Sequence, residues 1–109
     1  MTDKRTPTYD LVGFKKAFSS VDKLAATTVA VMGAAALGLD RQGIVDAIQT
    51  MERRHFYKST TSYANAKVWQ DVYHVPLVSS EPLASSEVAY VKFTADAITE
   101  FRLLSFKEK

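Results

Sequence analysis

Residues 56–73 read FYKSTTSYANAKVWQDVY, and from Phe56 onward the pattern of the chain changes from helical to extended. Aromatic and β-branched residues alternate there with polar ones, which is typical of a half-buried strand. A short turn containing Asn65 separates this strand from a second one over residues 68–75. The remaining predicted elements are strands over residues 88–94 and 99–106, joined near Asp96, and a loop over residues 76–87, which hold two prolines and four serines.

The first half of the chain has a helical pattern. Apolar residues recur at helical spacing over residues 11–21, and a second helix is predicted over residues 28–37, ended by Gly38 as a C-cap. Asp40 caps a third helix, which we expect to end in Glu52-Arg53-Arg54, where the two arginines form a basic run. Helices ahead of a run of strands predict an α+β fold, with the N-terminal helices on one face of a mostly antiparallel sheet. The length of 109 residues is that of one domain, residues 1–109.

Composition excludes several kinds of site. The chain has no cysteine, which rules out disulfides and thiolate metal sites, and only two histidines, so we expect a site without metal or other cofactor. The longest apolar run, residues 25–39, is too short and too weakly hydrophobic to span a bilayer, and the first ten residues lack an apolar signal core. We therefore expect a cytoplasmic protein. The net charge of +2 does not by itself indicate nucleic acid binding, so an RNA site would need locally concentrated positive charge.

One face of the predicted sheet gathers polar side chains. Successive side chains of a strand point to opposite faces, so their parity sorts them without a structure. We take Trp69 and Phe93 to face the helices. The opposite, outward face then carries Lys58, Gln70, His74, Tyr90 and Lys92.

Other notable residues have ordinary structural explanations. Asp71 falls on the apolar face by parity, so we expect it near the sheet edge or paired with a cation. Trp69 is expected in the core rather than as a platform for base stacking. We expect His55 to be a helix-end or packing residue, and the cations at 53–54 to be a solvated helix terminus.

The outward polar face would suit phosphodiester chemistry. It has neither a carboxylate pair nor an activated Ser or Cys nucleophile. RNA carries its own nucleophile, the 2′-hydroxyl, so a protein needs to align it, stabilise charge on the phosphate and assist proton transfer. Lys58 would stabilise that charge, Tyr90 would act as general acid or base or hold the phosphate in line, and Gln70 would orient the phosphate or read a base edge. His74 would carry a proton, since its ordinary pKa lies nearest neutrality.

A sheet face exposed to solvent carries the same residue types for solubility alone. On parity alone we favour that interpretation, because clusters of polar residues are only probabilistic evidence of function.

Four pieces of the sequence resemble the MqsR family of bacterial toxins, in the family's order. They are Lys4-Arg5-Thr6-Pro7, Leu37-Gly38-Leu39-Asp40, the FYKS and WQDVY segments of residues 56–73, and SFKEK at residues 105–109. The resemblance implies a RelE-like fold and a ribosome-independent endoribonuclease that cleaves mRNA at short GC-containing triplets. It also implies a small antitoxin partner that doubles as a DNA-binding repressor. The family's functional lysine, glutamine and tyrosine fall on Lys58, Gln70 and Tyr90.

The chain departs from the family pattern at positions that bear on specificity. Thr60 stands where the family usually has Met, and His74-Val75-Pro76 replaces Arg-Pro-Arg. The missing arginines are suited to phosphate or guanine recognition, so the cleavage specificity stays open. Arg102, in the last strand, could replace some of that charge, and it joins His74 and Lys92 as an additional candidate. A diverged scaffold that binds RNA or a partner protein without cutting is the alternative function.

Overall fold

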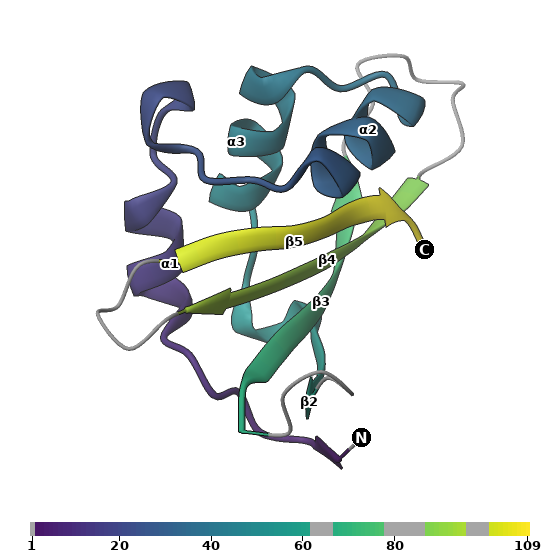
Figure 1. The fold of residues 1–109 in the computed structure, drawn as a ribbon. Coiled ribbons are helices and arrows are strands. Elements are labelled where there is room, and N and C mark those ends of the chain that lie inside the picture. Colours follow the sequence, from purple (N-terminus) through teal and green to yellow (C-terminus); the bar gives the residue numbers. More distant parts are fainter. Residues whose placement is uncertain (1, 62–66, 78–86, 96–100) are drawn as a thin grey trace.

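The computed structural model describes residues 2–61, 67–77, 87–95 and 101–109, and within them it shows an α+β arrangement (Figure 1). Five antiparallel strands form one sheet in chain order: β1 (Asp3–Lys4), β2 (Phe56–Thr61), β3 (Trp69–Leu77), β4 (Glu87–Ala95) and β5 (Phe101–Glu108). The helices α1 (Leu11–Ala17), α2 (Thr28–Ala36) and α3 (Arg41–Gln49) cover one face, which we call the helix side. The other face is called the open face. The predicted fold class is confirmed.

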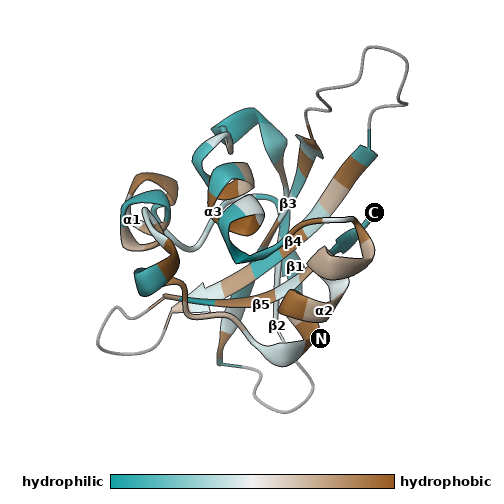
Figure 2. Cartoon of the chain, turned by 90° about the horizontal axis from the view of Figure 1, so that it is seen from above, coloured by the Kyte–Doolittle hydropathy of each residue, from teal (hydrophilic) through white to brown (hydrophobic). Residues whose placement is uncertain are grey.

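Carboxylates cap the N-termini of α1 and α3. Asp40 was predicted as a cap, and its carboxylate accepts a hydrogen bond from Gly43 N at 2.8 Å; Asp10, which was not predicted, accepts hydrogen bonds from the first turn of α1. Gly38 has a φ of +81°, a conformation that favours glycine, and it ends the turn after α2 as expected. Figure 2 shows polar and apolar residues mixed along α3, as befits a helix with one buried face. No helix in the described residues is long and apolar enough to cross a membrane.

Two predicted helix ends were wrong. The first helix stops at Ala17, and residues 21–23 form a separate 3₁₀ turn, η1 (Val21–Lys23). Ser20 between them is fully extended (φ −151°, ψ 161°), in keeping with the preference of serine for turns and caps over helix interiors. The third helix ends at Gln49 rather than in the basic run, because Glu52 is extended and caps a new 3₁₀ turn, η2 (Arg53–His55). His55 is half-buried, and its Nδ1 accepts from the Glu52 backbone, which confirms a helix-end role.

The strands differ from the prediction at their ends. β3 runs on through Pro76, predicted as loop, which lies opposite Val88 and is exposed. β4 already begins at Glu87. The two-residue β1 was not predicted, since so short a segment cannot show an alternation of polar and apolar residues. The predicted turn at Asn65, the rest of the loop at 78–86 and the connection near Asp96 lie outside the described residues.

The core lies between the helices and the helix side of the sheet. At its centre the Phe14 ring of α1 stacks on Phe93 of β4, with 3.7 Å between centroids and 4° between planes. Both side chains are fully buried, and truncating a ring of this kind typically costs about 3–5 kcal/mol. The core therefore fixes α1 on the helix side of β4 and leaves the other face of the central strands open.

The outer edge of β5 is covered by the chain before and within α2. Thr27 N donates to Leu103 O at 3.0 Å, and Leu103 N donates to Ala25 O at 2.8 Å, as in a short parallel strand. Gly33 of α2 lies so close to the sheet that a Cβ there would be 2.2 Å from the backbone oxygen of Phe106. This contact protects the edge from pairing with other chains and holds the last strand in place.

Candidate functional site

The strand register lines up the predicted polar residues in rows across the open face. One row runs Lys58, Val72, Lys92 and Ser105 from β2 to β5, and the next runs His74, Tyr90 and Lys107. Gln70 lies opposite Thr60, in the row on the other side of Val72. The parity prediction that Lys58, Gln70, His74, Tyr90 and Lys92 share one face is confirmed. Whether they act on a substrate stays a prediction.

Val72 forms the floor of this cluster. It has no exposed surface, yet it lies on the open face and outside the core cluster of the helix side. Its cover comes from the side chains around it, and Lys58, Tyr90 and Lys92 are each half-buried. These residues thus pack against one another in a layer over Val72. On a sheet face that serves only solubility, each side chain would instead extend separately into solvent.

The packing shifts the titration of three groups. Burial raises the pKa of Tyr90 above its ordinary value, and the nearby charge of Lys58 partly opposes this shift. Burial lowers the pKa of His74, with Lys109 adding to the effect. Burial also lowers the pKa of Lys92, followed by repulsion from Lys107 and Lys58. At neutral pH the phenol is therefore protonated and the imidazole neutral, which are the forms of an acid and a base.

Two residues of the cluster were missed by sequence reasoning. Lys107 lies opposite Tyr90, with its Nζ 5.2 Å from the ring centroid. Tyr57 was assigned to the opposite face from Lys58, but it stacks on His74 with centroids 4.3 Å apart. The SFKEK ending that contains Lys107 was a usable signal, whereas nothing in the local pattern marks Tyr57.

β1 brings a carboxylate to the site. Asp3 lies opposite Thr60, and its Oδ2 is 3.4 Å from the Lys58 Nζ. A hydrogen bond with Thr60 lowers the pKa of Asp3, and Lys58 adds to this shift. Both partners are partly exposed, so the pair is weak and a phosphate would compete for the lysine.

Arg102 lies farther from the centre of the cluster. It is exposed and opposite Thr94, at the end of β5 away from Lys107. Its neighbours Phe101 and Leu103 pack on the helix side, so alternation places Arg102 on the open face. It borders the cluster without joining the row of His74 and Tyr90.

Two expectations outside the cluster were wrong. Asp71 does not lie at the sheet edge, and it makes no ion pair with any residue that the structure describes. Its fully buried carboxylate instead accepts hydrogen bonds from Thr8 N and Tyr9 N at 2.9–3.1 Å. It anchors the N-terminal segment against β3. Trp69 lies outside the core cluster, half-buried, with the Lys4 Nζ 4.2 Å from its ring centroid.

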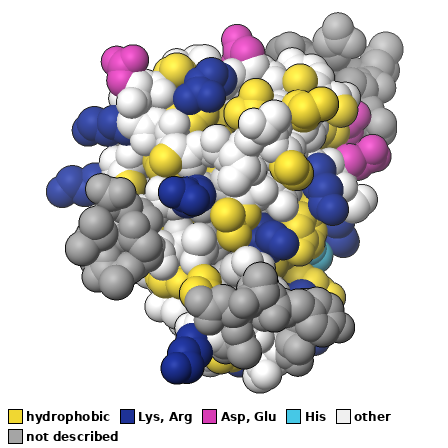
Figure 3. Space-filling view, viewed as in Figure 1, with side chains coloured by type: hydrophobic (Ala, Val, Ile, Leu, Met, Phe, Trp, Pro, Cys, Tyr) yellow, Lys and Arg dark blue, Asp and Glu magenta, His cyan; other side chains and the backbone are white. Residues whose placement is uncertain are grey.

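Positive charge is spread over the side of the molecule seen in Figure 3, with acidic groups near its margins. In the described residues no group of three or more His, Cys, Asp or Glu side chains is placed to hold a metal.

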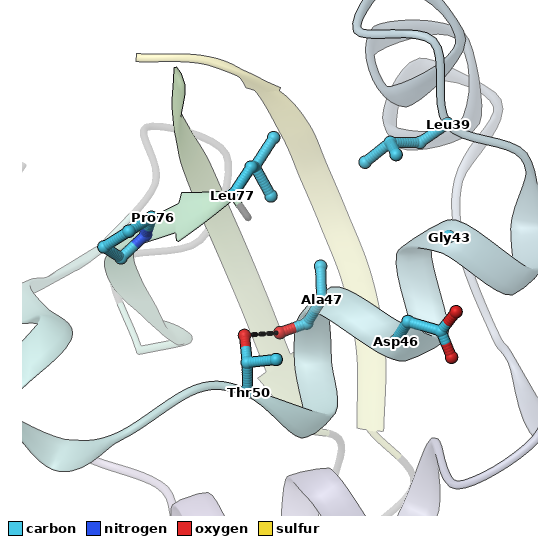
Figure 4. Close-up of a pocket in the computed structure, with 7 residues that line it drawn as sticks. All are labelled: Leu39, Gly43, Asp46, Ala47, Thr50, Pro76 and Leu77. Carbon is cyan, nitrogen blue, oxygen red and sulfur yellow. Dashed lines mark hydrogen bonds between the residues drawn. The ribbon is translucent and has the colours of Figure 1, made fainter. Parts of the chain in front are cut away.

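A pocket of about 250 Å³ between α3 and the end of β3 offers little chemistry (Figure 4). Its Thr50 hydroxyl donates to Ala47 O at 2.7 Å, and its Asp46 carboxylate accepts from Gln42. Leu39, Pro76 and Leu77 supply apolar walls. With its polar groups already paired, this pocket is a weaker candidate than the open-face cluster.

A larger cavity of about 550 Å³ lies on the helix side, bordered by the N-terminal segment, α1 and residues 51–53. The Tyr73 hydroxyl at its wall is buried and has no hydrogen-bond partner among the described residues. Burial, followed by the charge of Asp71, raises the pKa of Tyr73 to about 12.

Tyr73→Phe should raise the free energy of unfolding. An unpaired buried hydroxyl costs about 1–3 kcal/mol, and removing it leaves the ring contacts intact. Urea denaturation followed by circular dichroism should show a gain of about 1 kcal/mol. A loss of stability would mean instead that the hydroxyl is satisfied by ordered water in the cavity. The open-face cluster should be unaffected, because the Tyr73 ring lies in the core on the helix side.

Comparison with known proteins bears on the whole chain. Residues 6–108 match the family model described as "Motility quorum-sensing regulator, toxin of MqsA". The chain belongs to the MqsR toxin family. A relative from Escherichia coli (strain K12), named mRNA interferase toxin MqsR, is 36% identical over 107 residues, which cover 98% of this chain and 99% of the relative. Membership in the MqsR family confirms the resemblance drawn from the four sequence pieces.

The open-face cluster contains residues from the sequence segments on which the MqsR resemblance was drawn. Lys58 comes from the FYKS segment, Gln70 from WQDVY and Lys107 from the terminal SFKEK. The first two segments lie on consecutive strands and the third at the end of the chain, and the sheet register brings all three to one face. His74 lies among them, opposite Tyr90.

Proposed function

We propose that this protein is an endoribonuclease toxin that cuts single-stranded mRNA without a metal ion and without the ribosome. The observation that carries the proposal is the half-buried cluster of Lys58, His74 and Tyr90 in a chain of the MqsR family. The named activity of the Escherichia coli relative, an mRNA interferase, supports the same class of reaction. Cutting at short GC-containing triplets is the family expectation, and the replaced arginines bear on which triplet is chosen.

In the proposed reaction RNA supplies the nucleophile. The 2′-oxygen attacks the adjacent phosphorus while the bond from phosphorus to the 5′-oxygen of the next nucleotide breaks. His74 accepts the proton of the 2′-hydroxyl, and Tyr90 donates one to the departing 5′-oxygen. Lys58 and Lys107 stabilise the extra negative charge that builds on the phosphate. The products are a 2′,3′-cyclic phosphate and a 5′-hydroxyl.

The remaining residues would act on binding. Gln70, one row from Lys58, would orient the phosphate or read a base edge, and Lys92 adds positive charge beside the floor. Arg102, at the border of the cluster, would contact a more distant phosphate. We expect these three to affect affinity more than the rate of the bond-breaking step.

The pH dependence follows from the two shifted groups. The rate should rise as pH increases through the pKa of His74, below its ordinary 6.5, because only the neutral imidazole accepts a proton. It should fall through the pKa of Tyr90, above its ordinary 10, as the phenol loses the proton it must donate. His74→Ala should flatten the acid limb of kcat/KM measured from about pH 5 to 9. An unchanged profile would remove His74 from the proton transfer.

As a member of this family, the protein is further proposed to act in the cytoplasm as a single domain and to be neutralised by an antitoxin. The family description names MqsA as the antitoxin of that toxin, so a cognate MqsA-like protein is the partner to test. Any contact with operator DNA would be made through the antitoxin.

The experiment that tests the activity uses a defined single-stranded RNA. Purified protein is incubated with it in EDTA, and the ends of any fragments are analysed. Discrete cuts that end in cyclic phosphate are expected, and their positions would give the recognised triplet. Cleavage that requires added metal or ribosomes would contradict the proposal.

The alternative function is a diverged scaffold that binds RNA without cutting it. Two points favour it: by the sequence resemblance His74 stands where the family usually has arginine, and Asp3 lies beside Lys58. Salt-dependent binding of RNA with no fragments from several RNAs would support this alternative.

A further inference from the structure

Tyr57 reaches the open face because β2 contains a bulge. Phe56 lies opposite Tyr73 and Lys58 lies opposite Val72, so Tyr57 has no partner position on β3. Phe56 packs toward the core, whereas Tyr57 and Lys58 both turn to the open face. Bulges commonly re-aim a side chain next to a functional site.

The ring of Tyr57 is backed on one side and accessible to solvent. It stacks on His74 with 22° between the ring planes, and His74 in turn lies 6.1 Å from the Tyr90 ring. Tyr57 keeps 39% of its surface exposed, which makes it one of the few large apolar side chains exposed in the described residues. The bulge thus presents a supported aromatic surface next to Lys58 and Tyr90.

Two cations lie over this ring at the distances of cation–π contacts, one of them on the exposed and movable Arg5 side chain. The Arg5 guanidinium carbon lies 5.4 Å from the Tyr57 ring centroid, and the Lys58 Nζ lies 5.5 Å from it. Arg5 is exposed and donates to the backbone oxygen of Tyr57 at 3.2 Å. An aromatic platform bordered by positive charge matches a nucleotide, which has a flat base and a charged phosphate.

We propose that Tyr57, supported by His74, is a stacking site for an unpaired nucleobase beside the scissile phosphate. This inference rests on the proposed function and identifies which part of the substrate is recognised there. Proteins that bind single-stranded RNA stack unpaired bases on aromatic side chains. The bulge, the exposed ring and the two cations place one base on Tyr57 while the neighbouring phosphate lies at Lys58 and Tyr90. Since stacking tolerates every base, this site selects single-stranded over paired RNA and fixes which nucleotide lies at the cut, and it distinguishes little between the four bases.

The test uses the full-length protein and a short RNA whose cut position has been mapped. The RNA carries a 2′-deoxy nucleotide at the attacking position, so that it binds without being cut. The base analogue 2-aminopurine replaces each base near that position in turn, because its fluorescence is quenched on stacking. A second series replaces each base by an abasic nucleotide. Tyr57→Leu is the test variant: it removes the aromatic ring but keeps an apolar side chain beside His74. Tyr57→Phe and Tyr57→Trp are the controls, because they keep an aromatic ring.

We expect quenching at one position next to the cut site. Tyr57→Leu should lose it and weaken binding by about 5- to 100-fold, whereas the aromatic variants retain it. An abasic nucleotide there should weaken binding to the wild-type protein by a similar factor and have no further effect on Tyr57→Leu. On cleavable RNA, Tyr57→Leu should raise KM more than it lowers kcat.

A merely structural role for Tyr57 would give a different result. Tyr57→Leu would then lower kcat through His74, and the abasic penalty would be the same in variant and wild type, which would overturn the inference. If Tyr57→Leu does not fold, the abasic and 2-aminopurine series on wild-type protein decide, since the inference requires one sensitive position beside the cut. Wild-type protein that neither binds nor cuts RNA would instead overturn the proposed function, and the inference with it.

Discussion

Lys58→Ala should lower kcat/KM for RNA cleavage by about 100- to 1,000-fold while the protein stays folded, because it removes a fixed positive charge from the phosphate in the transition state. The lysine is half-buried beside Val72, and it lies close enough to Tyr90 for its charge to lower the pKa of the phenol. Tyr90→Phe should give a loss of about 100- to 10,000-fold, the range of a general acid. Rates on a defined RNA under single-turnover conditions measure both.

The matched control is Lys23→Ala. Lys23 is an exposed lysine of η1, a turn between α1 and α2, so its loss changes the net charge equally without touching the open face. Activity should then change little. The fold of Lys58→Ala should survive, since its pairing with Asp3 is partly exposed and therefore contributes little to stability. Full activity of both Lys58→Ala and Tyr90→Phe would show that the site lies elsewhere.

Gly33→Ala should lower the free energy of unfolding by about 2–3 kcal/mol. Glycine in a helix interior is normally unfavourable, so alanine would ordinarily stabilise α2. Here the new Cβ would lie 2.2 Å from the Phe106 backbone oxygen, and α2 would have to move away from β5. The midpoint of thermal unfolding should fall by roughly 10–20 °C, since about 4–8 °C corresponds to each kcal/mol in a domain of this size.

Gly13→Ala in α1 provides the control for this change. The nearest atoms to a Cβ at Gly13 are an Asp10 carboxylate oxygen at 3.3 Å and the Phe101 ring at 3.6 Å, both side chains that adjust. Its stability should stay unchanged or rise by about 0.5–1 kcal/mol. Equal effects of the two substitutions would mean that the close packing of α2 on β5 does not exist in solution. Because Lys107 follows Phe106, Gly33→Ala should also reduce RNA cleavage at temperatures where it is folded.

The candidate site was predictable in part. The alternation of side chains along the strands placed Lys58, Gln70 and His74 on one face of the sheet. The family resemblance singled out Lys58, Gln70 and Tyr90. The contribution of Lys107 needed the pairing of β4 with β5, and that of Asp3 needed the edge strand β1. The β1–β2 pairing joins segments far apart in the chain, and the register of β5 on β4 contains an irregularity between Lys92 and Phe93, so no local pattern announces either.

Asp71 shows the same limit in the core. Side-chain alternation correctly placed Asp71 on the apolar face of the sheet, but the sequence did not indicate which groups would bind its carboxylate. The partners are backbone N–H groups of Thr8 and Tyr9, more than 60 residues away. Any residue type supplies such a donor, so no side-chain pattern announces it.

Local physical chemistry is enough to specify the α+β order, the caps at Asp10 and Asp40, the turn at Gly38 and the faces of the central strands. These features depend on neighbouring residues: a carboxylate three positions from a free N–H, a glycine at positive φ, alternation of side chains. The bulge that turns Tyr57 onto His74 and the register that sets Lys107 against Tyr90 come only from the tertiary structure. Both depend on how one strand pairs with another. A single inserted residue moves the side chains on one side of the bulge to the opposite face of the sheet.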